Sequence, residues 1–356
     1  MGYQGNWDKS KKRFEAFWNR EIIDRCCISV TAHKPDLAYE AFPENEEDQI
    51  KYWTDGEWIL KRNLKRFENT YFDGDSFPQI FLNLGASGHA GFFKKAVYQF
   101  KENTVWFFFS HPEMNSQHIE FDPDSFLYKK TIEIARYLTK ESKKSFFVSM
   151  PDTSGNMDAL AHLRGSDALL IDLIDDSEEV KKSLSRIQSA WINIINAVYT
   201  IVKDNNDGGS TIGWLNTWAP GLHSQMQCDL SVMISPDTFR EFAVPELQEQ
   251  ADFLEYPLYH FDGIEQIRHL DLILSLDKLK AIQWTQVAGQ PSVIEYIPVL
   301  QKIQSAGKCL MIWVKPEEIE PLLENLSSRG LFLSVNVSTK DEAHEVVKAA
   351  ERLTHE

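Results

Sequence analysis

Short apolar runs alternate with segments of helical length along most of the chain, and this alternation constrains the fold more than any other feature. The strand-like runs are 26–31, 77–84, 145–150, 211–215, 257–259, 281–285, 308–314 and 332–337. The helix-like segments are 50–67, 158–174, 177–202, 236–254, 264–274, 296–306, 316–328 and 340–352. Strands separated by helix-length spacers are typical of parallel βαβ units. Because the strands are numerous enough to close a ring, the sequence predicts an α/β protein of the (β/α)8 TIM-barrel class.

The first part of the chain differs from the rest. Residues 1–70 are mainly helix-like and rich in acidic and aromatic side chains, with one short strand. The sequence therefore predicts an N-terminal helical extension, residues 1–70, packed on a barrel formed by residues 71–356. The total of 356 residues lies within the range of large α/β barrels.

Charge and hydropathy exclude several classes of partner. The net charge is −16 and Lys and Arg form no block, so nucleic acid is not expected as a partner. Apolar runs are too short to cross a membrane, and we expect a cytoplasmic protein. The four cysteines show neither a disulfide framework nor zinc-ribbon spacing; they are Cys26, Cys27, Cys228 and Cys309.

His260 and Asp262 follow the apolar run at 257–259 and lie two residues apart. Alternation along a strand places such residues on one face. At the mouth of a barrel, a neutral imidazole and a carboxylate so placed can hold a metal or form an acid–base pair. In the alternative interpretation His260 ends the strand and Asp262 caps the following helix, because Asp before Gly is ordinary N-cap chemistry. Both interpretations stay open at this stage.

Polar residues and tryptophans lie at the ends of the predicted strands. The members of this set are Asn83, Asp152, Trp214, Trp218, His260, Asp262, Gln283, Trp284, Trp313 and Asn336. The active sites of (β/α)8 barrels lie at these ends. Because indole faces suit stacking against a flat ring or sugar, the set predicts a small-molecule site.

Two stretches carry a resemblance to a known family. Residues 146–153 and 158–165 are similar to a strand, a Gly-Ala-Pro-type turn and a helix of that family. Residues 216–221 and 234–247 are similar to its Asp-Ser-Trp-Ala-Gly and Ser-Pro-x-x-Phe-x-x-Phe-x-x-Pro signature, which is the more specific match. The chain from about Tyr71 onward thus resembles the uroporphyrinogen decarboxylase superfamily, which includes barrel methyltransferases that work with corrinoid proteins. The resemblance implies a (β/α)8 barrel with its pocket at the C-terminal mouth.

The chain departs from the decarboxylase at several positions. Residues 19–26 lack the N-terminal arginine pair that binds the porphyrinogen carboxylates. The family's tyrosine falls near Ala161 and its late histidine near Asn336, so both are absent. The family's acid falls at Asp75 or Asp73, and Asp75 is the candidate for a charge-stabilising acid. The resemblance therefore implies that uroporphyrinogen is not the substrate.

The corrinoid methyltransferases suggest a metal site. Several of them hold zinc with a His-x-Cys pair and a later Cys. Here His260 and Asp262 occupy the first element, and the later Cys falls near Asn336. Cys228 or His223 would complete a site with His260 and Asp262, in which harder nitrogen and oxygen donors replace soft thiolates. Alternatively, Cys228 is a small buried apolar residue, and no metal is held.

Three functions are compatible with these residues. In the first, the chain is a methyltransferase that moves a methyl group from an O-methylated or similar small molecule to a corrinoid on a partner protein, with His260 and Asp262 activating the leaving atom. The expected substrate-binding residues are Asn83, Asp152, Trp214, Trp218, Gln283 and Trp284. In the second it is a decarboxylase or lyase of a small ring or sugar acid that uses Asp75. In the third it is a non-catalytic ligand-binding barrel. A homodimer is compatible with each.

Overall fold

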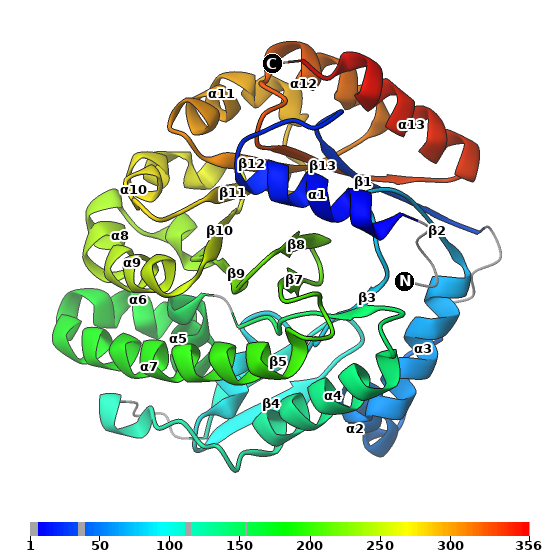
Figure 1. Cartoon of the computed structure of the whole chain (residues 1–356). Coiled ribbons are helices and arrows are strands. Elements are labelled where there is room, and N and C mark those ends of the chain that lie inside the picture. The colour runs from blue at the N-terminus through cyan, green and yellow to red at the C-terminus, as the bar shows by residue number, and fades with distance from the viewer. Residues whose placement is uncertain (1–5, 35–39, 111–114, 154, 356) are drawn as a thin grey trace.

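The computed structural model describes residues 6–34, 40–110, 115–153 and 155–355, and its centre is a seven-stranded sheet (Figure 1). The strand order is β2-β1-β13-β12-β11-β10-β9, with β2 antiparallel to β1 and every other neighbouring pair parallel. The strands are β1 (Cys27–His33), β2 (Thr70–Gly74), β9 (His223–Met226), β10 (Tyr256–Phe261), β11 (Ala281–Trp284), β12 (Cys309–Val314) and β13 (Leu331–Val337). The α/β class and the parallel sheet are thus confirmed.

Shorter strands continue the parallel run beyond this sheet. β3 (Gln79–Ile80) pairs in parallel with β6 (Phe147–Val148), and Met150 forms a parallel bridge to Ile212 in β7 (Ser210–Ile212). β7 forms an antiparallel hairpin with β8 (Thr217–Ala219). Within the described ranges, strand pairing does not close these pieces and the main sheet into one ring. The predicted closed barrel is therefore not confirmed.

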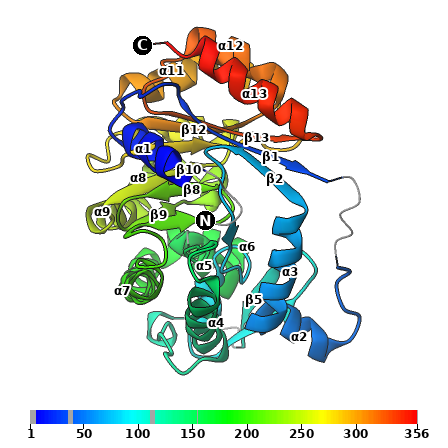
Figure 2. The same ribbon diagram turned by 45° about the vertical axis from the view of Figure 1, so that its right-hand side comes forward.

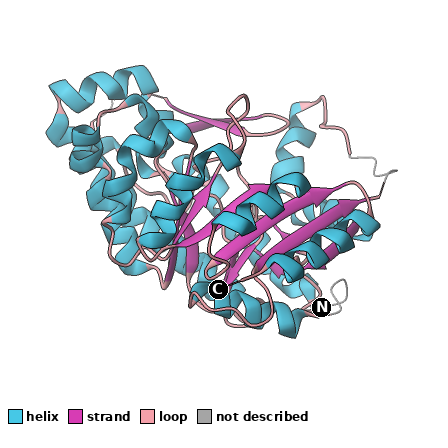
Figure 3. Cartoon of the chain, turned by 90° about the horizontal axis from the view of Figure 1, so that it is seen from above, coloured by secondary structure: helices cyan, strands magenta, loops and turns pink. Residues whose placement is uncertain are grey.

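Helices surround the strands, as the view from above shows (Figure 3). In the first half they are α1 (Trp7–Trp18), α2 (Glu46–Thr54), α3 (Gly56–Glu68), α4 (Phe126–Ser142), α5 (Asn156–Arg164), α6 (Ser166–Asp175) and α7 (Ser177–Val202). In the second half they are α8 (Pro236–Phe242), α9 (Val244–Phe253), α10 (Leu270–Leu274), α11 (Ile297–Ser305), α12 (Ile319–Asn325) and α13 (Lys340–Leu353). None of the helices in the described part of the chain has the length and apolarity needed to cross a membrane.

Three segments predicted as single helices are each split in two. The segment 50–67 breaks at Asp55, whose side chain accepts a hydrogen bond from the backbone N–H of Trp58 (2.8 Å) and caps α3. The segment 158–174 breaks at Gly165, whose φ of 87° is unfavourable for other residues. The segment 236–254 breaks before Pro245, which lies in the first turn of α9, where its missing N–H costs no hydrogen bond.

Helix α1 packs an aromatic cluster against the N-terminal ends of the strands. Trp7 and Phe14 contact Phe77, Trp218 and Phe332. Several residues of this cluster occupy the first three positions of their strands; they are Cys27, Leu258, Ala281, Cys309, Met311 and Phe332. Apolar and aromatic side chains therefore fill much of the space at the N-terminal strand ends.

The first seventy residues contribute directly to the sheet. β1 lies between β13 and β2, and α13 packs against both β1 and β2. Figure 2 shows α3 standing beside β2, away from α13. The division at residue 70 stays a prediction. The hairpin of β4 (Ala96–Phe100) and β5 (Val105–Phe109), and helix α4 after it, were not predicted from the sequence.

Candidate functional site

His260 points inward from β10, and its partner across the strands is Gln283 of β11. The imidazole Nδ1 lies 2.5 Å from Gln283 Oε1, and Gln283 Nε2 donates to Thr285 Oγ1 (2.8 Å). Because an amide oxygen only accepts, this network assigns the hydrogen of neutral His260 to Nδ1. Its Nε2 is then an unprotonated acceptor, and burial lowers the pKa of the ring.

Asp229 faces the free nitrogen of His260. It begins the short 3-10 helix Asp229–Met233, and its Oδ1 lies 3.9 Å from His260 Nε2. The other oxygen, Oδ2, accepts a hydrogen bond from Gln227 Nε2 (2.9 Å). Oδ1 is buried and has no hydrogen-bond partner among the described residues, although the side chain as a whole is 42% exposed. This oxygen therefore has hydrogen-bonding capacity that no described residue uses.

Asp158 holds the Asp229 segment in place. Its two carboxylate oxygens accept the backbone N–H groups of Asp229 (2.9 Å) and Leu230 (2.8 Å). Burial raises the pKa of Asp158 to about 6, the two hydrogen bonds oppose that shift, and the charge of Asp262 adds to it. Burial also raises the pKa of Asp229 well above its usual range, and the charges of Asp158, Asp262 and Asp152 raise it further. Asp229 thus keeps a proton more readily than an ordinary carboxylate.

Trp214 forms a wall beside His260. The two rings are nearly perpendicular, at 85°, with centroids 5.0 Å apart, and Trp313 lies 5.5 Å from Trp214 on its other side. Trp214 Nε1 donates to Gln225 Oε1 (2.6 Å), and Gln225 Nε2 donates to Asp152 Oδ1 (3.0 Å). We call the assembly the His260 group; its members are Asp152, Asp158, Trp214, Gln225, Asp229, His260, Asp262, Gln283 and Thr285.

The predicted pocket residues Trp218 and Trp284 lie elsewhere, so their assignment to this wall is wrong. Trp284 pairs with Phe261 across the strands and therefore points outward, stacked on Phe261 (5.4 Å) and beside Tyr296 (5.3 Å). Trp218 is fully buried under α1, where its Nε1 donates to the carbonyl oxygen of Asn206 (2.9 Å). Successive residues of a strand face opposite sides, so Gln283 and Trp284 cannot share a pocket.

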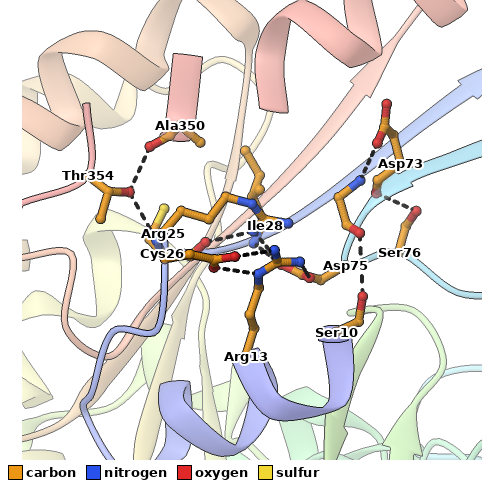
Figure 4. A network of polar contacts seen from close by, with 12 residues as sticks. Ser10, Arg13, Arg25, Cys26, Ile28, Asp73, Asp75, Ser76, Ala350 and Thr354 are labelled. Atoms are coloured by element: carbon orange, nitrogen blue, oxygen red, sulfur yellow. Dashed lines mark hydrogen bonds and ion pairs between the residues drawn. The ribbon is translucent and has the colours of Figure 1, made fainter. Parts of the chain in front are cut away.

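Asp75 is also far from this chemistry, at the start of β1 (Figure 4). Its Oδ2 accepts from Arg25 Nη1 (2.5 Å) and from the backbone N–H of Ile28 (3.0 Å), and its Oδ1 accepts from Arg13 Nη1 (3.1 Å). Arg13 also forms a bidentate pair with Asp24. The carboxylate is fully buried, is paired with two arginines and is not brought to the His260 group, so the catalytic role of Asp75 stays a prediction.

The two predicted asparagines do not join the His260 group. Asn83 Oδ1 accepts the backbone N–H of Gly85 (2.8 Å), and the side chain lines a small cavity beside α2 and α3. Asn336 lies at the exposed end of β13 and accepts from Thr31 Oγ1 (2.5 Å). Asn83 follows β3 and Asn336 lies near the end of β13, so the structure brings neither to β10.

The residues of the site do not fit a zinc ion. Cys228 is fully buried, its sulfur lies 3.8 Å from Met157 Sδ, and burial raises the pKa of its thiol well above the usual range. In the part of the chain that the structure describes, no three His, Cys, Asp or Glu side chains are arranged to hold a metal. Catalytic zinc sites use three protein ligands. We therefore derive no step through a metal at His260, Asp262 and Cys228.

Sequence analysis did not single out Asp158, Gln225, Asp229 or Thr285. Asp158 lies near the start of a predicted helix, and Asp229 follows Cys228 in a loop; neither position has a motif of its own. Their contact joins residues that are 71 positions apart. A carboxylate in an otherwise apolar helix start was the one local signal that could have marked Asp158.

The outward position of Trp284 can be tested. We expect Trp284→Leu to lower the free energy of unfolding by about 1–3 kcal/mol, because ring contacts in the packed layer are lost. The titration of the His260 ring, followed by NMR, should stay unchanged. Trp106→Leu is the matched control, since Trp106 is 47% exposed and should be near neutral. A shifted His260 titration in Trp284→Leu would place the indole in the site after all.

Comparisons with known proteins agree on the fold alone. No family model and no curated protein sequence matches the chain. Among solved structures, a methyltransferase from Methanosarcina mazei is similar over 96% of this chain and 98% of its own length, with a TM-score of 0.62 and 12% sequence identity. The chain therefore shares the fold of that methyltransferase across nearly its whole length.

Proposed function

We propose that this chain is an enzyme that removes a methyl group from a small O-methylated compound, with the His260 group supplying the proton for the leaving oxygen. The observation that carries the proposal is the buried, unpartnered Asp229 Oδ1, 3.9 Å from an unprotonated His260 Nε2. The fold shared with a methyltransferase supports the same class of reaction. The superfamily resemblance adds the inference that β3, β6 and β7 complete a (β/α)8 barrel of the uroporphyrinogen decarboxylase kind.

A nucleophilic acceptor takes the methyl carbon, the carbon–oxygen bond breaks, and its electron pair stays on the oxygen. The carboxylic acid of Asp229 gives its proton to that oxygen, and the product is an alcohol or phenol. The Asp229 carboxylate is then reprotonated from water. A protonated Asp229 at neutral pH requires the raised pKa that burial and the neighbouring carboxylates provide.

The other members of the His260 group would position the substrate. Gln283 fixes the ring of His260 so that Nε2 faces Asp229, and Asp158 fixes the backbone that carries Asp229. Trp214 and the partly exposed Trp313 offer indole surfaces for a small ring. We propose that the methyl acceptor is a corrinoid carried by a partner protein. Asp75 is ion-paired with Arg13 and Arg25. The decarboxylase alternative, which needs Asp75 as a charge-stabilising acid, is therefore less well supported.

A direct assay tests this function. The purified chain is incubated with a panel of methoxylated phenols and benzoates and with reduced cobalamin as methyl acceptor. We expect methylcobalamin and the demethylated product to appear together for the wild type. His260→Ala should remove turnover by removing the imidazole that faces Asp229. The exposed variant His344→Ala serves as the control and should remain active.

The results of this assay distinguish between the alternative functions. If neither methyl transfer nor its reverse from methylcobalamin occurs for any compound, the methyltransferase proposal fails. If the same compounds raise the melting temperature without turnover, the chain is a ligand-binding barrel.

A further inference from the structure

A large cavity lies outside the His260 group, along helix α3. Its volume is about 850 Å³, which is in the range of small-molecule sites. Helical spacing puts Trp58, Lys61, Arg62, Lys65 and Arg66 along it, because residues three and four apart share a face. Four neighbouring cations are unusual in a chain of net charge −16.

The carboxylates that also line the cavity are mostly engaged. Glu40 accepts a hydrogen bond from Trp58 Nε1 (2.9 Å), and Asp55 accepts the backbone N–H of Trp58 as the cap of α3. Glu57 is exposed to solvent. Within the described residues, no carboxylate oxygen lies within 4 Å of the Lys61 or Lys65 ammonium group. Within the described part of the chain, Lys61 and Lys65 are therefore not ion-paired with a carboxylate.

Arg62 is the most constrained of these cations. Its guanidinium carbon lies over the Tyr52 ring, 3.7 Å from the ring centroid, which is within the range of a cation–π contact. Its Nη1 is buried and has no hydrogen-bond partner among the described residues. Burial lowers the pKa of Arg62, which means that its charge is poorly solvated. A buried donor without a partner is costly, and an anion at this position would relieve that cost.

Arg62 also separates the large cavity from a smaller one. The inner cavity, about 220 Å³, is lined by Arg62, Tyr52 and Asn63 and reaches Phe81 and Asn83 just after β3. Tyr52, Arg62 and Asn63 line both cavities. An oxyanion bound at Arg62 would therefore lie between an open aromatic chamber and the strand-end residue Asn83.

We propose that this cavity is a second binding site, for a small planar-ring compound that carries an oxyanion. The oxyanion contacts Arg62 and Lys65, and the ring lies against the aromatic side chains Tyr52 and Trp58, whose ring centroids are 6.3 Å apart. Carboxylate and phosphate offer the same acceptor geometry to a guanidinium, so either can supply the oxyanion. The site does not use the His260 group and stands independently of the proposed methyl transfer.

Isothermal titration of the full chain tests the site. The probes are benzoate and phenyl phosphate as the two oxyanion sources, benzyl alcohol as a neutral ring, and inorganic phosphate as an anion without a ring. We expect benzoate or phenyl phosphate to bind more tightly than both controls, and binding to weaken with added salt. Arg62→Gln should weaken binding at least about tenfold, the size of one charge-assisted hydrogen bond.

Three further variants keep the test decisive. Lys65→Gln changes an exposed side chain that the fold does not need and should also weaken binding. Lys140→Gln, on the surface of α4, and His260→Ala should leave it unchanged. Equal affinity for benzyl alcohol, unaltered affinity in both α3 variants, or no heat of binding for either oxyanion at millimolar concentration overturns the proposal. Loss of binding in His260→Ala would assign the ligand to the His260 group instead.

Discussion

Asp229→Asn is expected to abolish methyl transfer and, at neutral pH, to raise the stability of the protein. The amide matches the carboxylic acid in shape but cannot release a proton to a leaving oxygen. Positioned general acids contribute about 10²–10⁴-fold to rates. We expect a loss of that size in the rate of demethylation, with substrate affinity nearly unchanged because Gln227 can still contact the side chain.

The expected gain in stability follows from the sign of the pKa shift. The folded protein holds the Asp229 proton more tightly than the unfolded chain, because burial and three neighbouring carboxylates disfavour its charge. Below the pKa of Asp229 in the unfolded chain, both the folded and the unfolded state are protonated, and the shift does not change the free energy of unfolding. Between the unfolded and the folded pKa only the unfolded chain gives up its proton, so the free energy of unfolding falls over that range and stays lower at higher pH. The variant removes that cost, so the difference from the wild type should grow with pH and vanish in acid.

Rates and melting temperatures measured from pH 5 to 9 test both parts. In the wild type, turnover should fall as pH rises through the raised pKa of Asp229. Asp252→Asn is the matched control, because among the described residues Asp252 forms an ion pair only with Lys278, at the surface, and should leave rate and stability unchanged. An active Asp229→Asn enzyme, or one that is less stable than the wild type at pH 8, would contradict the assignment of Asp229 as the acid.

Asp75→Ala is expected to cost about 3–5 kcal/mol of unfolding free energy, because it leaves buried arginine charge without a partner. Arg25 is only 3% exposed, and Asp75 is its one ion-pair partner within 4 Å among the described residues. The variant also frees the backbone N–H of Ile28 at the start of β1. Since natural domains are stable by about 5–15 kcal/mol, this is a large fraction of the total.

Urea unfolding at pH 7 measures this loss. The control is Asp237→Ala, whose only ion pair in the described structure, to Arg240, is exposed and should contribute little. If the Asp75→Ala protein is fully folded and normally stable but shows no turnover, Asp75 takes part in catalysis. That outcome would contradict the structural role assigned here.

Long, regular patterns were predictable from the sequence because they depend on neighbours along the chain. The predicted helix at 177–202 coincides with α7, and the segment at 340–352 matches α13 to within one residue. The late strands were also found, since strands buried on both faces are continuous apolar runs. The β4–β5 hairpin was missed because its aromatic strands follow no helix-length spacer; Val97, Trp106 and Phe108 remain exposed there.

The site was predictable only in part. Alternation along a strand correctly placed His260 toward the interior, and pairing of β10 with β11 brought Gln283 to it. The same alternation excludes Trp284, which is one position further along and faces the helix layer. The prediction that Trp218 lines the pocket failed for a local reason. An indole near a strand end has the same sequence signal whether it faces a pocket or packs against an aromatic helix such as α1.

The sequence by itself determined the α/β class, the order of the main helices and strands, and the inward face of His260. These follow from periods of 2 and 3.6 residues, which a chain sets locally. Only the tertiary structure decided that Asp229 faces His260, that Asp158 holds the Asp229 backbone, and that Asp75 is ion-paired with two arginines. Those contacts join segments far apart in the chain, and their energies come from burial and from charges brought together by packing, which no local pattern records.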